Sequence, residues 1–283
     1  MPLPPRLPAT KKKWGQHFLI DDTIARTIVT ASGVKPGDRV VEIGPGPGAL
    51  TTWLLRTTGE VWAVELDGDL LPHLQQRTAG LGTLHIQQRD ILQVDFHQLA
   101  QQLGGELCIV ANLPYNISTP LLMHCIEQRS AISRMTVMVQ TEVAERLAAT
   151  PGTKAYGALT IPCQLWMSVE TLLHVPPTAF HPPPKVQSTV IQLVRRTTPL
   201  ATPHDPALFM QVVRAAFGQR RKILANALGT LHHAPRSWLT QAHIDPQRRG
   251  ETLSVAEFAN LTNLLATERL RIDTPSTSPQ DAC

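Results

Sequence analysis

The sequence has no long apolar segment and few cysteines, and each shortage excludes a class of protein. No run of about 18 apolar residues occurs in the 283-residue chain, so we predict no membrane-spanning helix. The basic stretch 1–15 has no apolar stretch behind it and lacks the pattern of a secretory signal. The four cysteines form no Cys-x-x-Cys pair, so we expect mostly buried thiols and no metal site, in a protein of the reducing cytoplasm.

The chain is not strongly charged overall, but its basic residues are concentrated in two stretches. The formal net charge is +4. Residues 195–250 contain nine Lys and Arg against two Asp, a net charge of +7, and the first thirteen residues add four positive charges. The rest of the chain is therefore acidic, at −7. Such segregation fits a surface for a polyanion such as nucleic acid, although a solvated basic face would produce it as well.

Strand and helix patterns alternate through the first half of the chain. A helix is expected at 21–32, with Asp21 or Asp22 as its N-cap. Short apolar runs predict buried strands, and helical patterns follow three of them: strands at 38–44, 60–67, 84–92 and 106–113, helices at 48–57, 70–80 and 120–128. This alternation is typical of a mostly parallel sheet covered by helices on both faces.

The second half of the chain changes from strand patterns to helical ones. The patterns are a strand running into a helix at 134–150, strand character at 156–175 and 188–196, a linker at 197–206, and helices at 207–231, 236–243 and 254–270. The last strands leave no room for helical crossovers, which predicts an antiparallel edge of the sheet. We therefore expect a flexible arm at 1–13, an α/β domain at 14–198, a helical domain at 199–272 and a disordered tail at 273–283.

A glycine-rich loop, VVEIGPGPGAL, follows the first strand. Gly44, Gly46 and Gly48 let the backbone turn tightly and approach a ligand, and the next helix offers its N-terminus. Glu65 comes about 20 residues later at the end of the second strand, where a carboxylate accepts hydrogen bonds from ribose hydroxyls. A structural turn, NAD or S-adenosylmethionine would each explain this pattern. Glu42 completes the form E-x-G-x-G-x-G, the usual first motif of Rossmann-like methyltransferases, and favours S-adenosylmethionine.

Polar residues also end the third and fourth strands. Asp90 follows the third strand, where it can accept from an adenine amino group or cap a helix. The tetrapeptide Asn112-Leu113-Pro114-Tyr115 follows the fourth. Because the carboxyl ends of parallel strands share one edge of a sheet, these groups are expected to line one crevice.

The tetrapeptide resembles the (Asp/Asn/Ser)-Pro-Pro-(Tyr/Phe) motif of amino-group N-methyltransferases. The lone pair of an exocyclic adenine amine is delocalised into the ring, which makes the amine a poor nucleophile. The Asn112 side-chain oxygen and the Leu113 carbonyl can accept its two hydrogens and draw the nitrogen toward tetrahedral geometry. Pro114 would fix that carbonyl, and Tyr115 can stack on an extruded base. An Asx-type turn is the plain structural alternative.

The whole chain resembles the KsgA family of small-subunit rRNA adenine N6,N6-dimethyltransferases. Its motifs occur in family order: KKKWGQHFLID, VVEIGPGPGALT, VELD, RDIL, NLPYNIS, QTEVAERLAATPGTKAYGAL and FGQRRKILANAL. The stretch AFHPPPKVQSTVIQL is similar to the family's Phe-x-Pro-x-Pro-Lys-Val-x-Ser segment. The resemblance implies an α/β, Rossmann-like class I S-adenosylmethionine-dependent methyltransferase fold, with a mostly parallel seven-stranded sheet and a small C-terminal helical domain.

The resemblance also implies roles for individual residues. S-adenosylmethionine would be bound by His17, Leu19, Gly44, Gly46, Glu65, Asp90 and Asn112. Many members have Asn where this chain has His17. Catalysis would rest on Asn112, Leu113, Tyr115 and Phe180, with Phe180 as a second stacking face opposite Tyr115. RNA phosphates would be contacted by Lys11, Lys12, Lys13, Arg220, Arg221 and Lys222.

Family members methylate two adjacent adenosines of the 3′-terminal hairpin twice each, within a partly assembled small subunit. The related 23S-directed resistance dimethylases share most of these motifs, but FGQRRKILANAL favours the small-subunit enzymes. The resemblance therefore implies small-subunit rRNA within the immature 30S subunit as partner, a cytoplasmic enzyme, no membrane partner and a monomer.

Three other interpretations stay open at this point. The methylated target could be large-subunit rRNA or DNA adenine. A dinucleotide oxidoreductase would explain the glycines and Glu65, but not the stretch 112–115 or the basic C-terminal region. A ribosome-assembly factor, whose binding matters more than its chemistry, would use the same motifs.

Overall fold

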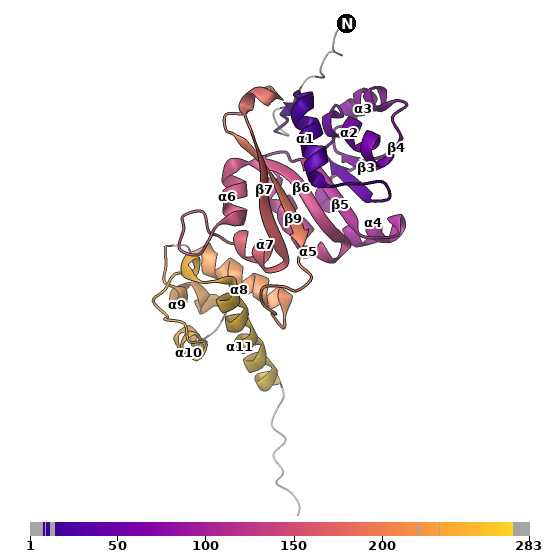
Figure 1. Cartoon of the computed structure of the whole chain (residues 1–283). Helices are drawn as coiled ribbons and strands as arrows, with labels where there is room; N and C mark the ends of the chain where they lie inside the picture. Colours follow the sequence, from indigo (N-terminus) through magenta and orange to yellow (C-terminus); the bar gives the residue numbers. More distant parts are fainter. Residues whose placement is uncertain (1–7, 9, 12–14, 220, 232, 274–283) are drawn as a thin grey trace, which may run out of the picture. The chain divides into compact units, whose positions relative to one another are not determined.

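The chain forms two compact units, which are described separately. The computed structural model describes residues 8, 10, 11, 15–219, 221–231 and 233–273 (Figure 1). From residue 269 onward only the main chain is described. One unit comprises the described residues up to 148 together with 166–197, and the other comprises 149–165 together with those from 198 onward. The stretch 149–165 thus belongs to the second unit, although the sequence interpretation included it in a continuous domain at 14–198. Most of the predicted arm and tail lies outside the described residues.

Seven strands of the first unit form one sheet in the order β4-β3-β2-β5-β6-β9-β7. They are β2 (Arg39–Ile43), β3 (Glu60–Glu65), β4 (Thr83–Gln88), β5 (Leu107–Asn112), β6 (Ile132–Gln140), β7 (Met167–Val175) and β9 (Ser188–Arg195). The pairs from β4 to β6 are parallel, and β9 runs antiparallel to both β6 and β7. The predicted mostly parallel sheet with an antiparallel edge is confirmed.

Helices cover both faces of this sheet, so successive residues of a central strand are both buried. Val40 and Val41 of β2 are each 0% exposed although they point to opposite faces. Val40 packs in one cluster with Ile28 and Leu54, from helices α1 and α2. The helices of this unit are α1 (Asp22–Ser32), α2 (Ala49–Thr58), α3 (Leu71–Thr78), α4 (Phe96–Leu103), α5 (Ser118–Glu127) and α6 (Thr141–Ala148). The described helices include none that is long and apolar enough to cross a membrane.

Most predicted elements are present, with local differences. The Asp21 side chain accepts from the Ile24 N–H at 3.0 Å, which makes Asp21 the N-cap of α1. Helix α4 was not predicted. The strand expected at 84–92 ends earlier, at Gln88, and Asp90 caps the short 3-10 turn that follows.

The strand predicted at 156–175 is wrong in its first half. Residues Thr160–Trp166 form helix α7, and only Met167–Val175 form a strand, β7. The Thr160 hydroxyl accepts from the Gly157 N–H at 3.0 Å, so a local side-chain bond holds the turn that starts the helix. The β-branched and apolar composition of this stretch concealed that signal.

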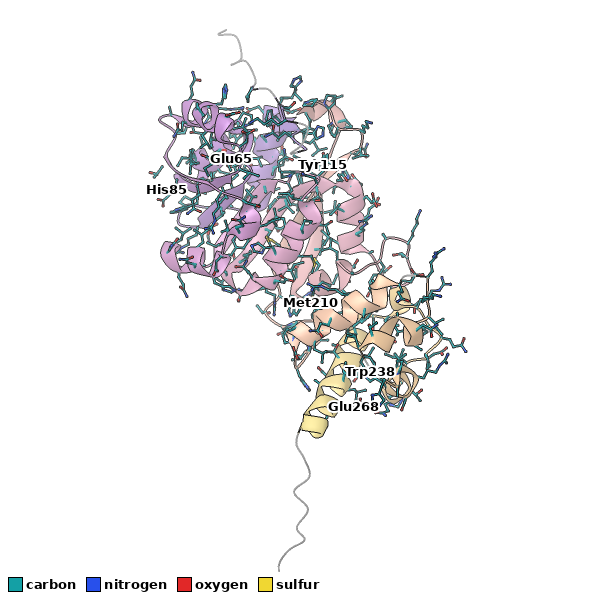
Figure 2. The ribbon with its side chains drawn as sticks, turned by 180° about the vertical axis from the view of Figure 1, so that it is seen from behind. Glu65, His85, Tyr115, Met210, Trp238 and Glu268 are labelled. Carbon is teal, nitrogen blue, oxygen red and sulfur yellow. The ribbon has the colours of Figure 1, made fainter. Side chains whose placement is uncertain are left out.

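The second unit is helical, with α8 (Pro206–Gly218), α9 (Leu224–Ala227), α10 (Pro235–Gln241) and α11 (Val255–Asp273) after α7. Its core includes Phe209, Trp238 and Phe258, each 0% exposed. The Trp238 indole N–H donates to the Leu261 carbonyl at 3.0 Å, so this buried donor is satisfied (Figure 2).

The continuous helix predicted at 207–231 is broken between α8 and α9. The main-chain N–H of Leu224 donates to the Arg248 carbonyl at 2.7 Å, instead of continuing the helical ladder. Arg221 and Lys222 therefore lie in an exposed turn and not on a helix.

Candidate cofactor and catalytic site

A pocket opens at the carboxyl ends of β4, β3, β2 and β5, which are neighbours in that order in the sheet. It encloses about 840 Å³ of non-atom space, including solvent at its mouth. Each strand end contributes one predicted cofactor residue to the lining: Asp90, Glu65, Gly44 and Asn112. Glu65 and Tyr115 lie at this same edge in Figure 2.

The glycine loop is folded onto the acid that follows β3. Gly44 and Gly46 have φ of +62° and +56°, in the left-handed region that favours glycine. The Gly46 N–H donates to Glu65 Oε2 at 3.1 Å. A Cβ at Gly46 would also meet the Phe18 ring at 3.4 Å. Glycine therefore suits both the backbone conformation of the loop and its close contact with residues that line the pocket.

The Glu65 carboxylate is nearly buried and is oriented by the main chain. Its Oε1 accepts from the Asp67 N–H at 2.8 Å, and its Oε2 accepts from Gly46. Burial raises the pKa of this carboxyl above its ordinary value, more than these hydrogen bonds lower it. Each carboxylate oxygen can accept a further hydrogen bond. The group can therefore receive the two hydroxyls of a ribose.

Asp90 has the capping role that its sequence position allowed, and one of its oxygens remains open for the other role. Its Oδ1 accepts from the Leu92 N–H at 3.0 Å and caps the 3-10 turn. Within the described part of the chain, Oδ2 accepts no hydrogen bond, and the residue lines the pocket. A capped carboxylate with one open oxygen can accept from an amino group such as that of adenine.

Glu42 lies beneath the glycine loop, beside a smaller cavity that adjoins the pocket. It is 1% exposed, and its Oε2 has no hydrogen-bond partner among the described residues. The Thr51 hydroxyl lies nearby without meeting hydrogen-bond geometry. Burial raises the pKa of the Glu42 carboxyl to about 8. At neutral pH this carboxyl is therefore mostly protonated and offers one buried hydrogen-bond donor and one acceptor close to the loop.

The donors and acceptors of the glycine loop favour S-adenosylmethionine over a dinucleotide. A dinucleotide pyrophosphate needs free N–H groups at the glycine loop. Here Gly44 N–H donates to the Val64 carbonyl, Gly46 N–H to Glu65, and Gly48 N–H to the main chain. The polar groups that remain are mostly acceptors. They fit a cofactor with ribose hydroxyls, an adenine amine and a positively charged methionine part.

Asn112 is held by the N-terminal segment. Its Nδ2 donates to the His17 carbonyl at 3.1 Å, which leaves Oδ1 facing away from that bond. The Leu113 N–H donates to the Met138 carbonyl at 3.1 Å and fixes the following peptide group. No described residue donates to Asn112 Oδ1 or to the Leu113 carbonyl oxygen. Two acceptors are therefore available at the rim of the pocket.

Tyr115 also lines the pocket and is fixed at its hydroxyl and on one ring face. The hydroxyl is 2.6 Å from Ser188 Oγ, and burial raises the pKa of the phenol. The ring stacks on the His17 imidazole, with centroids 5.3 Å apart and planes at 29°. The imidazole Nδ1 lies 2.7 Å from the Pro182 carbonyl oxygen. The sequence did not indicate the contacts with Ser188 and His17.

Phe180, the predicted second stacking face, is not among the residues that line the pocket. It is 2% exposed and packs in the hydrophobic core. Strand β8 (Phe180–His181) pairs antiparallel with β1 (Phe18–Leu19), and this pairing places Phe180 across from Leu19. Leu19 itself lines the smaller adjoining cavity. The stacking role of Phe180 stays a prediction.

The predicted RNA-binding residues are described only in part. Arg221 and Lys222 are exposed, and neither forms an ion pair with another described residue. Lys11 is instead bonded to Asp67 and Asp69. Lys12, Lys13 and Arg220 lie outside the described residues.

Comparison with known proteins gives one consistent result. The sequence matches the ribosomal RNA adenine dimethylase family over residues 8–267. It is 51% identical over 252 residues to ribosomal RNA small subunit methyltransferase A of Magnetococcus marinus, covering 89% of this chain and 90% of the relative. The protein of that name in Geobacillus kaustophilus is 45% identical, covering 90% and 91%. A crystal structure of a dimethyladenosine transferase from Plasmodium falciparum is 26% identical, with a TM-score of 0.71 and coverage of 87% and 96%.

The family match extends through both units, and the pocket has acceptors suited to the cofactor. The predicted fold class, enzyme class and cofactor are confirmed. The chain belongs to the ribosomal RNA adenine dimethylase family and is an S-adenosylmethionine-dependent rRNA adenine dimethyltransferase.

Proposed function

We propose that the enzyme dimethylates the N6 amino groups of two adjacent adenosines in the 3′-terminal hairpin of small-subunit (16S) rRNA, within an immature 30S subunit. The names of the relatives with 42–51% identity support the small subunit as target. The observation that carries the chemistry is the bond from Asn112 to the His17 carbonyl. It leaves the Asn112 oxygen available beside the cofactor pocket.

Asn112 and Leu113 position the target amine. The Asn112 Oδ1 and the Leu113 carbonyl accept its two hydrogens and draw the nitrogen toward tetrahedral geometry. The amine needs no strong general base, because its proton becomes acidic only after methylation has begun. Catalysis is therefore mostly positioning and electrostatic stabilisation.

The cofactor residues hold the methyl donor against this amine. Glu65 accepts from the ribose hydroxyls, and Asp90 accepts from the adenine amino group. S-adenosylmethionine supplies a sulfonium methyl group, which the amine takes by direct displacement. Glu65 and Gly46 are bonded to each other, so the glycine loop is linked directly to the ribose site.

Tyr115 supports the extruded adenine. Its hydroxyl is held by Ser188, and one ring face is already covered by His17. Stacking of a base on an aromatic ring is sequence-tolerant, and it compensates part of the cost of removing the base from its neighbours. In this arrangement the adenine uses the other face of Tyr115 or displaces the imidazole.

The second unit supplies contacts to the RNA backbone. Arg221 and Lys222 lie in an exposed turn and can bind phosphates, which position the substrate without reading its sequence. We assign Lys12, Lys13 and Arg220 to the same task by their place in the sequence. The enzyme works as a monomer in the cytoplasm, where small subunits are assembled.

The test is methyl transfer from labelled S-adenosylmethionine to unmethylated small subunits, with bare rRNA and large subunits as controls. Nucleoside analysis is expected to give dimethyladenosine from small subunits only. Label in large subunits alone would identify the enzyme as a resistance-type dimethylase instead. Rescue of subunit maturation by an inactive Asn112→Ala variant would assign its main role to assembly.

A further inference from the structure

Lys11 forms ion pairs with two carboxylates beside the cofactor pocket. Its Nζ lies 2.6 Å from Asp67 Oδ1 and 2.5 Å from Asp69 Oδ2. The Asp67 side chain is 1% exposed, whereas that of Asp69 is 79% exposed. An ammonium group with these partners is poorly placed to contact an RNA phosphate as well.

Gln16 joins Lys11 to the wall of the pocket. The Lys11 N–H donates to Gln16 Oε1 at 2.7 Å, and Gln16 Nε2 donates to Asp67 Oδ2 at 3.0 Å. Both oxygens of the Asp67 carboxylate therefore accept from the N-terminal segment. Gln16 lines the pocket together with Gly15, His17 and Phe18. The bonds at Asp67 thus fix a segment that forms one wall.

The same contacts reach the acid that receives the ribose. The Asp67 N–H donates to Glu65 Oε1 at 2.8 Å. Burial alone would raise the pKa of the Asp67 carboxyl, but the hydrogen bonds from Lys11 and Gln16 hold it below its ordinary value. Without Lys11, the charged Asp67 would be buried beside Glu65 with less compensation, and this loop would be destabilised.

We propose that Lys11 is a positioning residue for S-adenosylmethionine: its ion pair with Asp67 and Asp69, bridged by Gln16, holds residues 15–18 as a wall of the pocket and fixes the loop that carries Glu65. The proposal rests on the cofactor and is independent of which RNA is methylated. It assigns Lys11 a different task from the phosphate contact that its basic neighbours suggest.

The test separates cofactor affinity from substrate affinity. Calorimetry measures the dissociation constant of S-adenosylmethionine for the full chain, and filter binding measures that of unmethylated small subunits. We expect Lys11→Met to weaken cofactor binding about tenfold. Its affinity for small subunits is expected to stay at the wild-type value. Lys11→Arg, which keeps the charge, is expected to restore most of the cofactor affinity.

Matched variants decide between positioning and general destabilisation. Asp69→Asn removes the exposed partner and is expected to weaken cofactor binding in the same direction, by about two- to fivefold. Lys35→Met removes another exposed lysine of this unit and is expected to bind the cofactor like the wild type. Normal cofactor binding by both Lys11→Met and Asp69→Asn overturns the proposal. If Lys11→Met loses affinity for small subunits but binds the cofactor normally, Lys11 contacts the RNA and the proposal is overturned.

Discussion

Asn112 Nδ2 donates a hydrogen bond of 3.1 Å to the carbonyl oxygen of His17. A carbonyl can only accept, so the contact decides which end of the amide faces it. The Asn112 oxygen is thereby turned away from His17. The N-terminal segment thus orients the side chain at the end of β5 that we propose to be catalytic.

Removing this amide should abolish methyl transfer while sparing RNA binding. We expect Asn112→Ala to lower kcat by about 10²–10³-fold, as expected for a lost donor or acceptor in a preorganised site. Affinity for small subunits should be unchanged, because the phosphate contacts lie elsewhere. Single-turnover methylation and filter binding on the same preparation measure the two effects. Normal turnover by this variant would contradict the proposed role of Asn112 in positioning the amine.

Asn112→Asp provides a sharper version of the same test. The carboxylate keeps an acceptor for the amine but has no hydrogen to donate to the His17 carbonyl, so two oxygens would face each other. If orientation by His17 matters, this variant should lose about as much activity as Asn112→Ala. Near wild-type activity would show that the acceptor alone is sufficient.

Tyr115 and Ser188 should behave as one unit. Their oxygens are 2.6 Å apart, and Ser188 is 0% exposed within β9. We expect Tyr115→Phe and Ser188→Ala each to lower kcat/KM for small subunits about tenfold, with S-adenosylmethionine affinity retained. The double variant should be little worse than either single variant, because both remove the same bond.

A double-mutant cycle in single-turnover conditions measures this coupling, and Ser168→Ala on the exposed edge of β7 is the control. Additive losses would mean that the two hydroxyls act separately. Retained activity in both single variants would show that the ring is held by packing on His17 instead.

The basic turn of the second unit should affect RNA binding alone. Charge reversal at Arg221 and Lys222 is expected to weaken binding of small subunits and to flatten its dependence on salt by about one unit of slope per lost phosphate contact. Cofactor affinity is expected to stay unchanged. The measurement is small-subunit binding at several salt concentrations. An unchanged salt slope would remove these residues from the interface.

The cofactor edge was predictable from the sequence because its signals are local. Gly44, Glu65, Asp90 and Asn112 each follow a short apolar strand, and parallel strands bring their carboxyl ends to one edge. Strand order then needs no further information to gather them in one pocket. The family resemblance added chemical roles to positions that the pattern had already placed together.

Several features that the sequence did not indicate depend on long-range contacts. Phe180 is turned into the core by pairing with β1, far away in the chain, and no local pattern announces that pairing. Lys11 is drawn to Asp67, although its neighbours in the sequence suggest a basic arm. After α8 ends at Gly218, the main-chain N–H of Leu224 bonds to Arg248 in a distant turn. Such features become visible only in the tertiary structure.

The buried Glu42 should make stability depend on pH. Its folded pKa of about 8 lies above the ordinary 4.5, so the folded state holds the proton more tightly than the unfolded state. The stability that this bound proton contributes is fully present below pH 4.5 and is lost as the pH rises toward 8. Above pH 8, Glu42 no longer makes the unfolding free energy depend on pH. Glu42→Gln cannot lose this proton. Its unfolding free energy relative to wild type should therefore rise across this range, by a few kcal/mol at most.

Urea unfolding of the cofactor-free protein at pH 5, 6.5, 8 and 9 tests this dependence, with Glu170→Gln on the exposed face of β7 as the control. The difference between Glu42→Gln and wild type should be smallest at pH 5, grow to pH 8 and then level off. For the control, the difference in unfolding free energy from wild type should not grow with pH. An exposed carboxylate stays hydrated in the folded protein, so its charge costs little. A difference that stays flat from pH 5 to 9 would mean that Glu42 is ionised in the folded protein, with water or another group supplying its missing partner.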